Sequence, residues 1–172
     1  MTAFDMELAS PVPSGLSGGL GGPNQGGHQP PDWYIQFGMD LGAGEGVEVH
    51  AAFDAHVTKY SPHDPSADSG KVYGAQLFMR APNDMMGGFY THITNVPSEI
   101  AVGSQISRGD LLGTIMSFDG IPSHVHAALV EIIGGAPNGQ YQGVDLYQTI
   151  LNLADSTVTV TFAQDGSPPT VN

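Results

Sequence analysis

The sequence predicts a mainly β protein: a small antiparallel barrel-sandwich with one short C-terminal helix. First, 24 glycines and 13 prolines together exceed a fifth of the 172 residues, which is typical of many short strands joined by tight turns. Second, apolar and polar residues alternate over 47–58 and again over 157–162. Third, helical spacing of apolar residues occurs only over 145–154, where Asp145 can cap the first turn.

The expected elements follow the chain in order. We expect an N-terminal Gly/Pro-rich arm or loop over 1–32, a single folded domain over 33–154, and a C-terminal strand with a loose tail over 155–172. Within the domain, strands are predicted over 47–58, 71–81, 87–93, parts of 100–116 and 125–133, with a turn at 82–84.

Charge and composition exclude several classes of function. The net charge is −13, and the cations are Lys59, Lys71, Arg80 and Arg108, which is too few to neutralise a nucleic acid backbone. There is no cysteine, so a bound metal must use His, carboxylate or amide ligands. Neither a standard signal peptide nor a membrane span is visible, which predicts a soluble protein. Such a protein is expected to be cytoplasmic, released by a non-standard route, or a mature form whose leader has been removed.

The step His124-Val125-His126 is the strongest functional signal. Residues two apart on a strand project from the same face, so both imidazoles are expected roughly 6 to 7 Å apart in one small volume. Histidine is the commonest metal ligand and titrates near neutral pH, so this pair suits metal binding or proton transfer. Two exposed imidazoles on a solvated strand face are the alternative.

The order of motifs resembles the lysostaphin-like (LytM-type) zinc endopeptidases, which cut peptide cross-bridges of bacterial cell walls. The resemblance covers about residues 33 to 154 and rests on five stretches. They are Gln36-Phe37-Gly38-Met39-Asp40 against the family's His-x-Gly-x-Asp, the strand 46–55, Tyr90-Thr91-His92-Ile93, the Gly-rich turn 102–113, and His124-Val125-His126. The resemblance implies the family's barrel-sandwich fold, called a duplicated hybrid motif.

The resemblance also implies roles for individual residues. Zinc ligands would be Asp40, His126 and the residue at position 36, while His92 and His124 would act beside the metal as base or as stabiliser of the tetrahedral intermediate. This chain departs from the family at the first ligand, where it has Gln36. Because an amide oxygen is a poorer donor to Zn²⁺ than imidazole, a weakened zinc site is expected. His28 in the arm is an alternative source of the missing nitrogen.

Two functions therefore stand as hypotheses. One is a metallopeptidase-like domain of low or altered activity on cell-wall-type peptides. The other is an inactive pseudo-enzyme that binds a glycan, peptide or protein in the same groove without zinc. Trp33, Tyr34 and Tyr90 are expected to line that groove, with other aromatic residues as candidates. His50 and His56 could form a second metal site, although a solvated strand face is the preferred interpretation.

Overall fold

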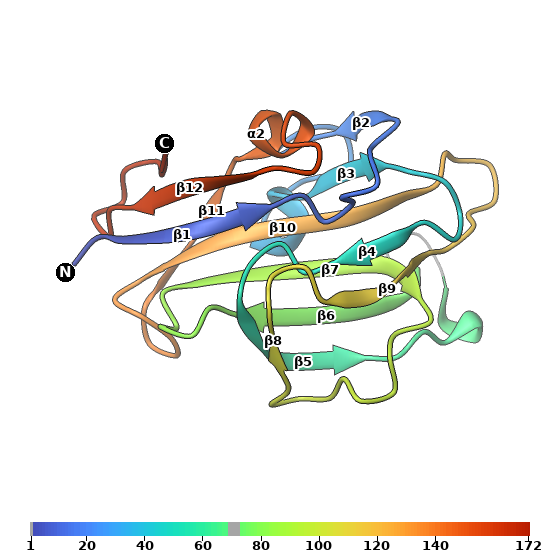
Figure 1. The fold of residues 1–172 in the computed structure, drawn as a ribbon, viewed down its shortest axis with the longest axis horizontal. Helices are drawn as coiled ribbons and strands as arrows, with labels where there is room; N and C mark the ends of the chain where they lie inside the picture. The colour runs from blue at the N-terminus through green and yellow to red at the C-terminus, as the bar shows by residue number, and fades with distance from the viewer. Residues whose placement is uncertain (1, 69–72) are drawn as a thin grey trace.

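A computed structural model describes residues 2–68 and 73–172. Figure 1 shows a mainly β fold with two antiparallel sheets. Within the described residues, the larger sheet has the order β2-β3-β10-β7-β6-β5-β8, with β11 beside β10 and the β4–β9 pair attached to β7. These strands are β2 (Gly18–Gly21), β3 (Met39–Gly42), β4 (Glu48–His50), β5 (Ala55–Ser61), β6 (Ala75–Arg80), β7 (Met86–Thr94), β8 (Gln105–Ile106), β9 (Leu111–Ile115), β10 (His124–Ile133) and β11 (Gln140–Val144).

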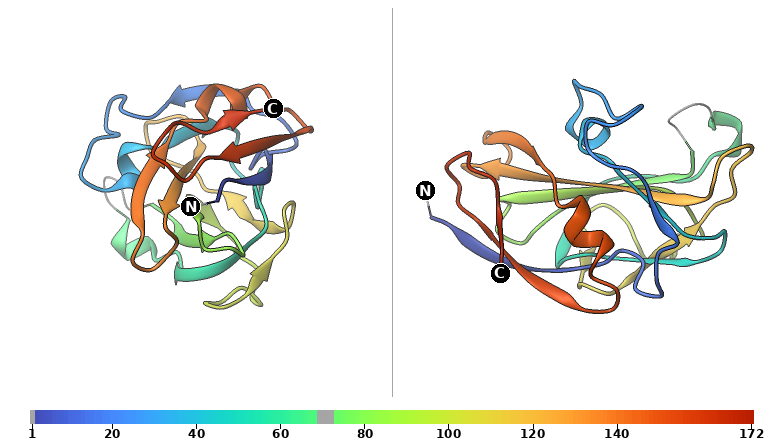
Figure 2. Two further views of the ribbon diagram at one scale, coloured as in Figure 1. Left: turned by 90° about the vertical axis from the view of Figure 1, so that its left-hand side faces the viewer. Right: turned by 90° about the horizontal axis from the view of Figure 1, so that it is seen from above.

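The smaller sheet joins the two ends of the chain. It has the order β1-β12-β13, with β1 at Phe4–Ala9, β12 at Thr157–Phe162 and β13 at Thr170–Val171. Seen from above in Figure 2, this sheet lies on one side of β7 and β10, and the segment containing β2 and the short helix α1 (Trp33–Gln36) lies largely on the other side. The core fills the space between the layers, with Phe53, Tyr90 and Phe162 among its largest buried side chains.

The predicted strands are found, with one interruption. The segment predicted as one strand over 47–58 forms β4 and β5, because Ala51, Ala52 and Phe53 are all buried in succession. A continuous strand would place every second one of these side chains on the opposite face. The turn at 82–84 is present, and Asn83 accepts a hydrogen bond from the backbone N–H of Met85. The part of the predicted strand 71–81 at Lys71 and Val72 lies outside the described residues.

The helices differ from expectation in number and length. The predicted C-terminal helix forms as α2 (Tyr147–Leu151), and the Asp145 carboxylate accepts a hydrogen bond from the backbone N–H of Tyr147. The helix α1 was not predicted, because its four residues are too few to show a helical period. In the described part of the chain, no helix has the length and apolar character needed to cross a membrane.

Within the described residues, segments near both ends of the chain form paired strands. The N-terminal arm carries β1, which pairs along its whole length with β12, and β2, which pairs with β3. The expectation of a loose tail after residue 164 is wrong, because Thr170 and Val171 pair with Thr161 and Val160. The strand β12 therefore has a partner strand on each side within its own chain.

Candidate functional site

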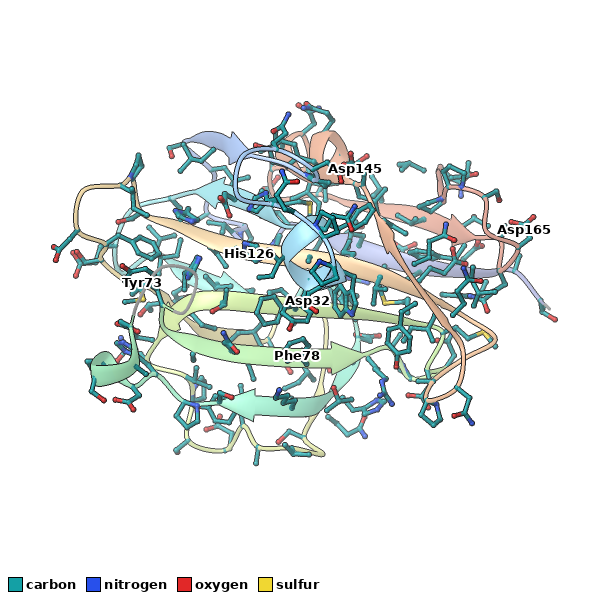
Figure 3. The ribbon with its side chains drawn as sticks, turned by 180° about the vertical axis from the view of Figure 1, so that it is seen from behind. Asp32, Tyr73, Phe78, His126, Asp145 and Asp165 are labelled. Atoms are coloured by element: carbon teal, nitrogen blue, oxygen red, sulfur yellow. The ribbon has the colours of Figure 1, made fainter. Side chains whose placement is uncertain are left out.

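The register between β3 and β10 brings Asp40 beside His126. In this antiparallel pair His126 lies opposite Asp40 and His124 lies opposite Gly42. Residues directly opposite each other share a face of the sheet, so Asp40 and both histidines point to the same side. The His124-Val125-His126 step predicted from sequence is thus on a strand, and both imidazoles are buried. Figure 3 shows His126 on the face of the sheet that α1 crosses.

A bulge in β7 turns His92 onto the same face. On the other side of β10, His126 lies opposite Thr91, so simple alternation would send His92 away from the site. The register of β6 with β7 shifts at this point: Ala75 pairs with Ile93 and Gln76 pairs with Thr91, which leaves His92 as the extra residue. Its φ of 68° lies in the left-handed region. Bulges commonly re-aim a side chain next to a functional site, and this one brings His92 into the cavity beside His124.

The N-terminal arm delivers a third imidazole to Asp40. The strand β2 ends with Gly21 opposite Asp40, and a turn follows in which the backbone N–H of Gln25 donates to the carbonyl of Gly22. The next turn closes when the N–H of His28 donates to the carbonyl of Gln25. Gly22 cannot carry a side chain, because a Cβ would overlap the ring of Tyr147. The two turns bring His28 back to the sheet, where it is buried.

Three imidazoles converge on one carboxylate oxygen. Asp40 Oδ1 lies 3.2 Å from His126 Nδ1, 3.3 Å from His28 Nε2 and 3.6 Å from His124 Nε2. One ligand atom from each of His28, Asp40 and His126 lies within 4.8 Å of the others, close enough to hold a metal ion. Among the described residues, this is the group of His, Asp and Glu side chains that meets that condition.

Backbone carbonyls fix the orientation of all four imidazoles around Asp40. The contacts are His28 Nδ1 to Gly22 O at 2.8 Å, His92 Nδ1 to Tyr73 O at 2.8 Å, His124 Nδ1 to Pro122 O at 2.8 Å and His126 Nε2 to Tyr34 O at 2.7 Å. A carbonyl oxygen can only accept, so each of these ring nitrogens carries the hydrogen. When a ring is neutral, its opposite nitrogen has a lone pair for a metal ion, which is the arrangement that metal-binding histidines adopt. When that nitrogen of His28 or His126 carries a proton instead, it donates to Asp40.

The site favours an ionised carboxylate and a neutral His92. Burial raises the pKa of Asp40, but the hydrogen bonds from His126 and His28 and the nearby imidazoles outweigh it and leave that pKa well below its usual range. Burial, the largest effect, lowers the pKa of His92 to about 4, and the neighbouring His126 and His124 add to the lowering. At pH 7 Asp40 is therefore a carboxylate and His92 is a neutral imidazole.

A cavity of about 440 Å³ opens above these residues. All four histidines and Asp40 line it, and Leu20, Ile35, Tyr73, Phe118 and Ile121 supply most of its apolar wall. Phe118 stacks on His124 with ring centroids 4.9 Å apart and meets the edge of His92 at 5.0 Å. The volume of the cavity is within the range of small-ligand sites, and its mixture of apolar wall and convergent polar groups is typical of such sites.

Gln36 does not reach this cluster. Its side-chain amide donates to Asn24 Oδ1 at 2.8 Å, and its backbone carbonyl accepts from the backbone N–H of Asn24 at 2.9 Å. Gln36, the predicted metal ligand, thus binds the N-terminal arm at Asn24. The imidazole of His28 instead lies beside Asp40, where a third metal ligand is needed. Sequence reasoning kept His28 only as an alternative, because nothing in a Gly-rich arm fixes its path.

The three residues expected to line a ligand groove lie in different places. Tyr90 is buried in the core, where its hydroxyl accepts a hydrogen bond from the backbone N–H of Ala52, so it does not line a groove. Trp33 and Tyr34 line a second cavity on the other side of α1, and Tyr34 also reaches the cluster through its carbonyl. The expectation failed for Tyr90 because alternation on β7 directs it to the face opposite Phe89.

The remaining histidines lie outside the cavity. His50 contacts Glu48 and the carbonyl of Gly109, and His56 faces Asp84 across 3.4 Å. His63 contacts Asp68 at 2.9 Å in the loop after β5. The group of described residues that lies close enough to hold a metal ion does not include His50 or His56.

Gly38 leaves room for the ring of His126, and this gives a testable expectation. A Cβ at Gly38 would overlap Cε1 of that ring and lie 2.7 Å from its Nε2 and 3.0 Å from the carbonyl oxygen of Ile35. In Gly38→Ala the ring must turn away from the Tyr34 carbonyl, so we expect a loss of about 1–3 kcal/mol in the free energy of unfolding. Urea denaturation measures it. Gly44→Ala is the matched control, because its Cβ would meet only Val47 at 3.9 Å, and an equal loss there would contradict the assignment.

Comparison with known proteins finds relatives in structure and none in sequence. No protein-family model and no curated protein matches this chain. Among solved structures, lysostaphin from Staphylococcus simulans aligns over 87% of this chain and 55% of its own length, with 16% identity and a TM-score of 0.55. LytU aligns over 83% of this chain and 88% of its own, with 17% identity and a TM-score of 0.53. The catalytic domain of lysostaphin aligns over 78% of this chain and 92% of its own, with 17% identity and a TM-score of 0.52.

These similarities define the fold. The chain has the fold of the lysostaphin-like peptidases, as the order of its motifs predicted. It spans about half the length of full-length lysostaphin and most of the catalytic domain of that protein.

Proposed function

We propose that this protein is a metal-dependent peptidase in which His28, Asp40 and His126 hold a zinc ion. The observation that carries the proposal is the convergence on Asp40 of imidazole nitrogens whose opposite ring nitrogens are tied to backbone carbonyls. Two imidazoles and one carboxylate form a ligand set typical of catalytic zinc, which leaves a coordination position open. The ligand set predicted from the sequence keeps Asp40 and His126, and His28 takes the place that was assigned to Gln36.

The donor chemistry of the cluster supports a cation at its centre. His126 faces acceptors at both ring nitrogens, Asp40 at Nδ1 and the Tyr34 carbonyl at Nε2, so the ring needs either a proton or a metal ion between Nδ1 and the carboxylate. His28 has the same arrangement, with Gly22 at Nδ1 and Asp40 at Nε2. A zinc ion bound here would polarise a peptide carbonyl and make hydroxide available at neutral pH.

His124 and His92 are placed to move protons. Each neutral ring donates from Nδ1 to a backbone carbonyl and offers the Nε2 lone pair to the cavity. In that state neither has a hydrogen for a negatively charged oxygen, so both serve first as proton acceptors. After taking a proton at Nε2, either ring can return it to the leaving amine. Of the two sequence-based roles, base and oxyanion stabiliser, this geometry favours the base.

The substrate is proposed to be a peptide, because the cavity combines polar groups with an apolar wall. Leu20, Ile35 and Ile121 offer contacts to a chain lying over the cluster, and among the described residues of the wall there is no cation to attract a phosphate. The fold shared with lysostaphin, described as an antimicrobial peptidase, supports a peptide of the bacterial cell wall as the substrate class. The glycan-binding or peptide-binding pseudo-enzyme remains the alternative hypothesis.

Metal content decides between these two functions. The protein is purified without chelator or added metal, and its divalent metals are measured by mass spectrometry and by titration of the metal-free protein with zinc. We expect about one equivalent of zinc, with proton release on binding because the ligands must be deprotonated. Less than about a tenth of an equivalent, with no uptake in the titration, would contradict the peptidase and favour the pseudo-enzyme.

A further inference from the structure

A second cavity lies on the same face of the large sheet, on the far side of α1. It has a volume of about 270 Å³, and its walls come from six elements. The lining residues that matter here are Trp33, Lys59, Phe78, Arg80, Val130 and Tyr141. The helix α1 separates the two cavities, because Ile35 faces the histidine cluster while Trp33 and Tyr34 face the second cavity. Figure 3 shows Phe78 on the strand β6, on the face that α1 crosses.

The charged side chains that line this cavity are positive, whereas the net charge of the chain is negative. The chain has 17 acidic residues and four Lys and Arg, yet two of those four cations, Lys59 and Arg80, line this one cavity. Among the described residues no Asp or Glu lines it, whereas the histidine cavity and three further cavities are each lined by at least one. Within the described chain neither cation forms an ion pair with a carboxylate. In so acidic a protein, two cations without carboxylate partners indicate a site that needs their charge.

Aromatic side chains hold both cations at the cavity. The ammonium group of Lys59 lies 5.4 Å from the centre of the Phe78 ring, in a cation–π contact, and Nη2 of Arg80 lies 3.5 Å from the hydroxyl of Tyr141. Trp33 packs edge-on against Phe78 with ring centroids 6.3 Å apart. Val130 and Ile132 add an apolar part to the lining. The cavity thus combines apolar and aromatic lining residues with two positive groups.

We propose that this cavity binds the C-terminal carboxylate of a peptide together with its apolar last residue. The guanidinium of Arg80 presents a planar set of donors that matches a carboxylate, and Lys59 adds a second charge. The net charge of −13 repels polyanions at long range, which favours a small group with a single charge over a polymer of phosphates. The helix α1 lies between the cavities, so a peptide that crosses it reaches the histidine cluster. The inference rests on the proposed peptidase function and adds to it a preference for the C-terminal end of the peptide.

Trp33 is the only tryptophan of the chain, so its fluorescence reports on this cavity directly. The metal-free protein is titrated with an N-acetylated Ala-Ala-Leu peptide that has a free carboxylate, and with the same peptide as its C-terminal amide. We expect the free acid to bind at least about tenfold more tightly than the amide, because only the acid makes charge-assisted hydrogen bonds. A Lys59→Gln, Arg80→Gln double variant should reduce that difference to less than about twofold.

Arg108→Gln is the control, since it removes one cation from a different cavity. It should leave the preference for the free acid unchanged. Equal binding of acid and amide to the unaltered protein would overturn the proposal, and so would an equal loss in the control. The titration uses no metal, so a protein that binds zinc and shows no carboxylate preference would disprove the carboxylate site alone.

Discussion

His28→Ala is expected to lower zinc affinity more than about 100-fold. Loss of a residue that only hydrogen-bonds to a metal ligand costs about 10–100-fold in affinity, and this change removes a ligand itself. Hydrolysis of a Gly-rich peptide should fall in parallel. The physical reason is the contact of His28 Nε2 with Asp40 Oδ1 at 3.3 Å, on a ring that Gly22 orients through Nδ1. Zinc affinity is measured by competition with a chromophoric chelator, and folding is followed by circular dichroism in the same samples.

Gln36→Ala provides the decisive comparison. Gln36 touches Asn24 and not the cluster, and its carbonyl still accepts the N–H of Asn24 when the side chain is removed. We therefore expect its effect on zinc affinity to stay below about tenfold, the lower end for supporting residues. The reverse order, with Gln36→Ala more damaging than His28→Ala, would restore Gln36 as the ligand and contradict the structure. For the same reason, Gln36→His should not raise zinc affinity.

The parts of the site on regular strands could be predicted from the sequence. His124 and His126 lie on β10 in the place that the His-x-His step indicated. Asp40, which was named only through the resemblance to a family, lies opposite His126 on β3, a strand that was not predicted. Alternation with a period of two is a local property, so it fixes which face each side chain takes as soon as the strand is recognised. The same property explains why Thr157–Phe162 was predicted without error.

The parts that depend on irregular backbone could not. His28 reaches Asp40 because β2 pairs with β3 and two successive turns follow, and neither the pairing of a Gly-rich strand nor its register has a clear sequence signal. His92 enters the cavity through a bulge with a φ of 68°, whereas alternation alone would place it on the other face. Its role came from the resemblance to a family, not from its position on a strand.

One signal in the sequence could have favoured His28. The run Gly21-Gly22-Pro23-Asn24 is rich in turn-forming residues, and Asn24 takes a φ of 63° that asparagine tolerates better than most residues. Such a run predicts a reversal of the chain, which would return His28 to the sheet. A disordered arm has no need for a turn at a fixed position, so the pattern argues for an ordered segment.

His124→Asn is expected to reduce the rate of peptide hydrolysis by about 10²–10⁴, the usual contribution of a positioned acid or base, while the protein keeps about one equivalent of zinc. The Nε2 atom of His124 lies 3.6 Å from Asp40 Oδ1, farther than the nitrogens of His28 and His126, and its other nitrogen donates to Pro122. Asparagine can still donate to that carbonyl, so the loop before β10 should keep its conformation. A large loss of zinc in this variant would instead make His124 a ligand.

His92→Asn tests the second proton acceptor under matched conditions. Asparagine tolerates the left-handed backbone that His92 adopts, so the bulge in β7 should persist. Because burial lowers the pKa of His92 to about 4, the ring is neutral and able to accept a proton throughout the range above that pH. The rate of the unaltered protein should therefore not fall through protonation of His92 until the pH approaches 4.

His56→Asn is the control for both variants. Its imidazole faces Asp84 outside the cavity, so the substitution should leave the rate of hydrolysis and the zinc content unchanged. If His92→Asn retained the full rate while His124→Asn lost it, proton transfer would belong to His124 alone, and the bulge would serve only to seat His92 against Phe118.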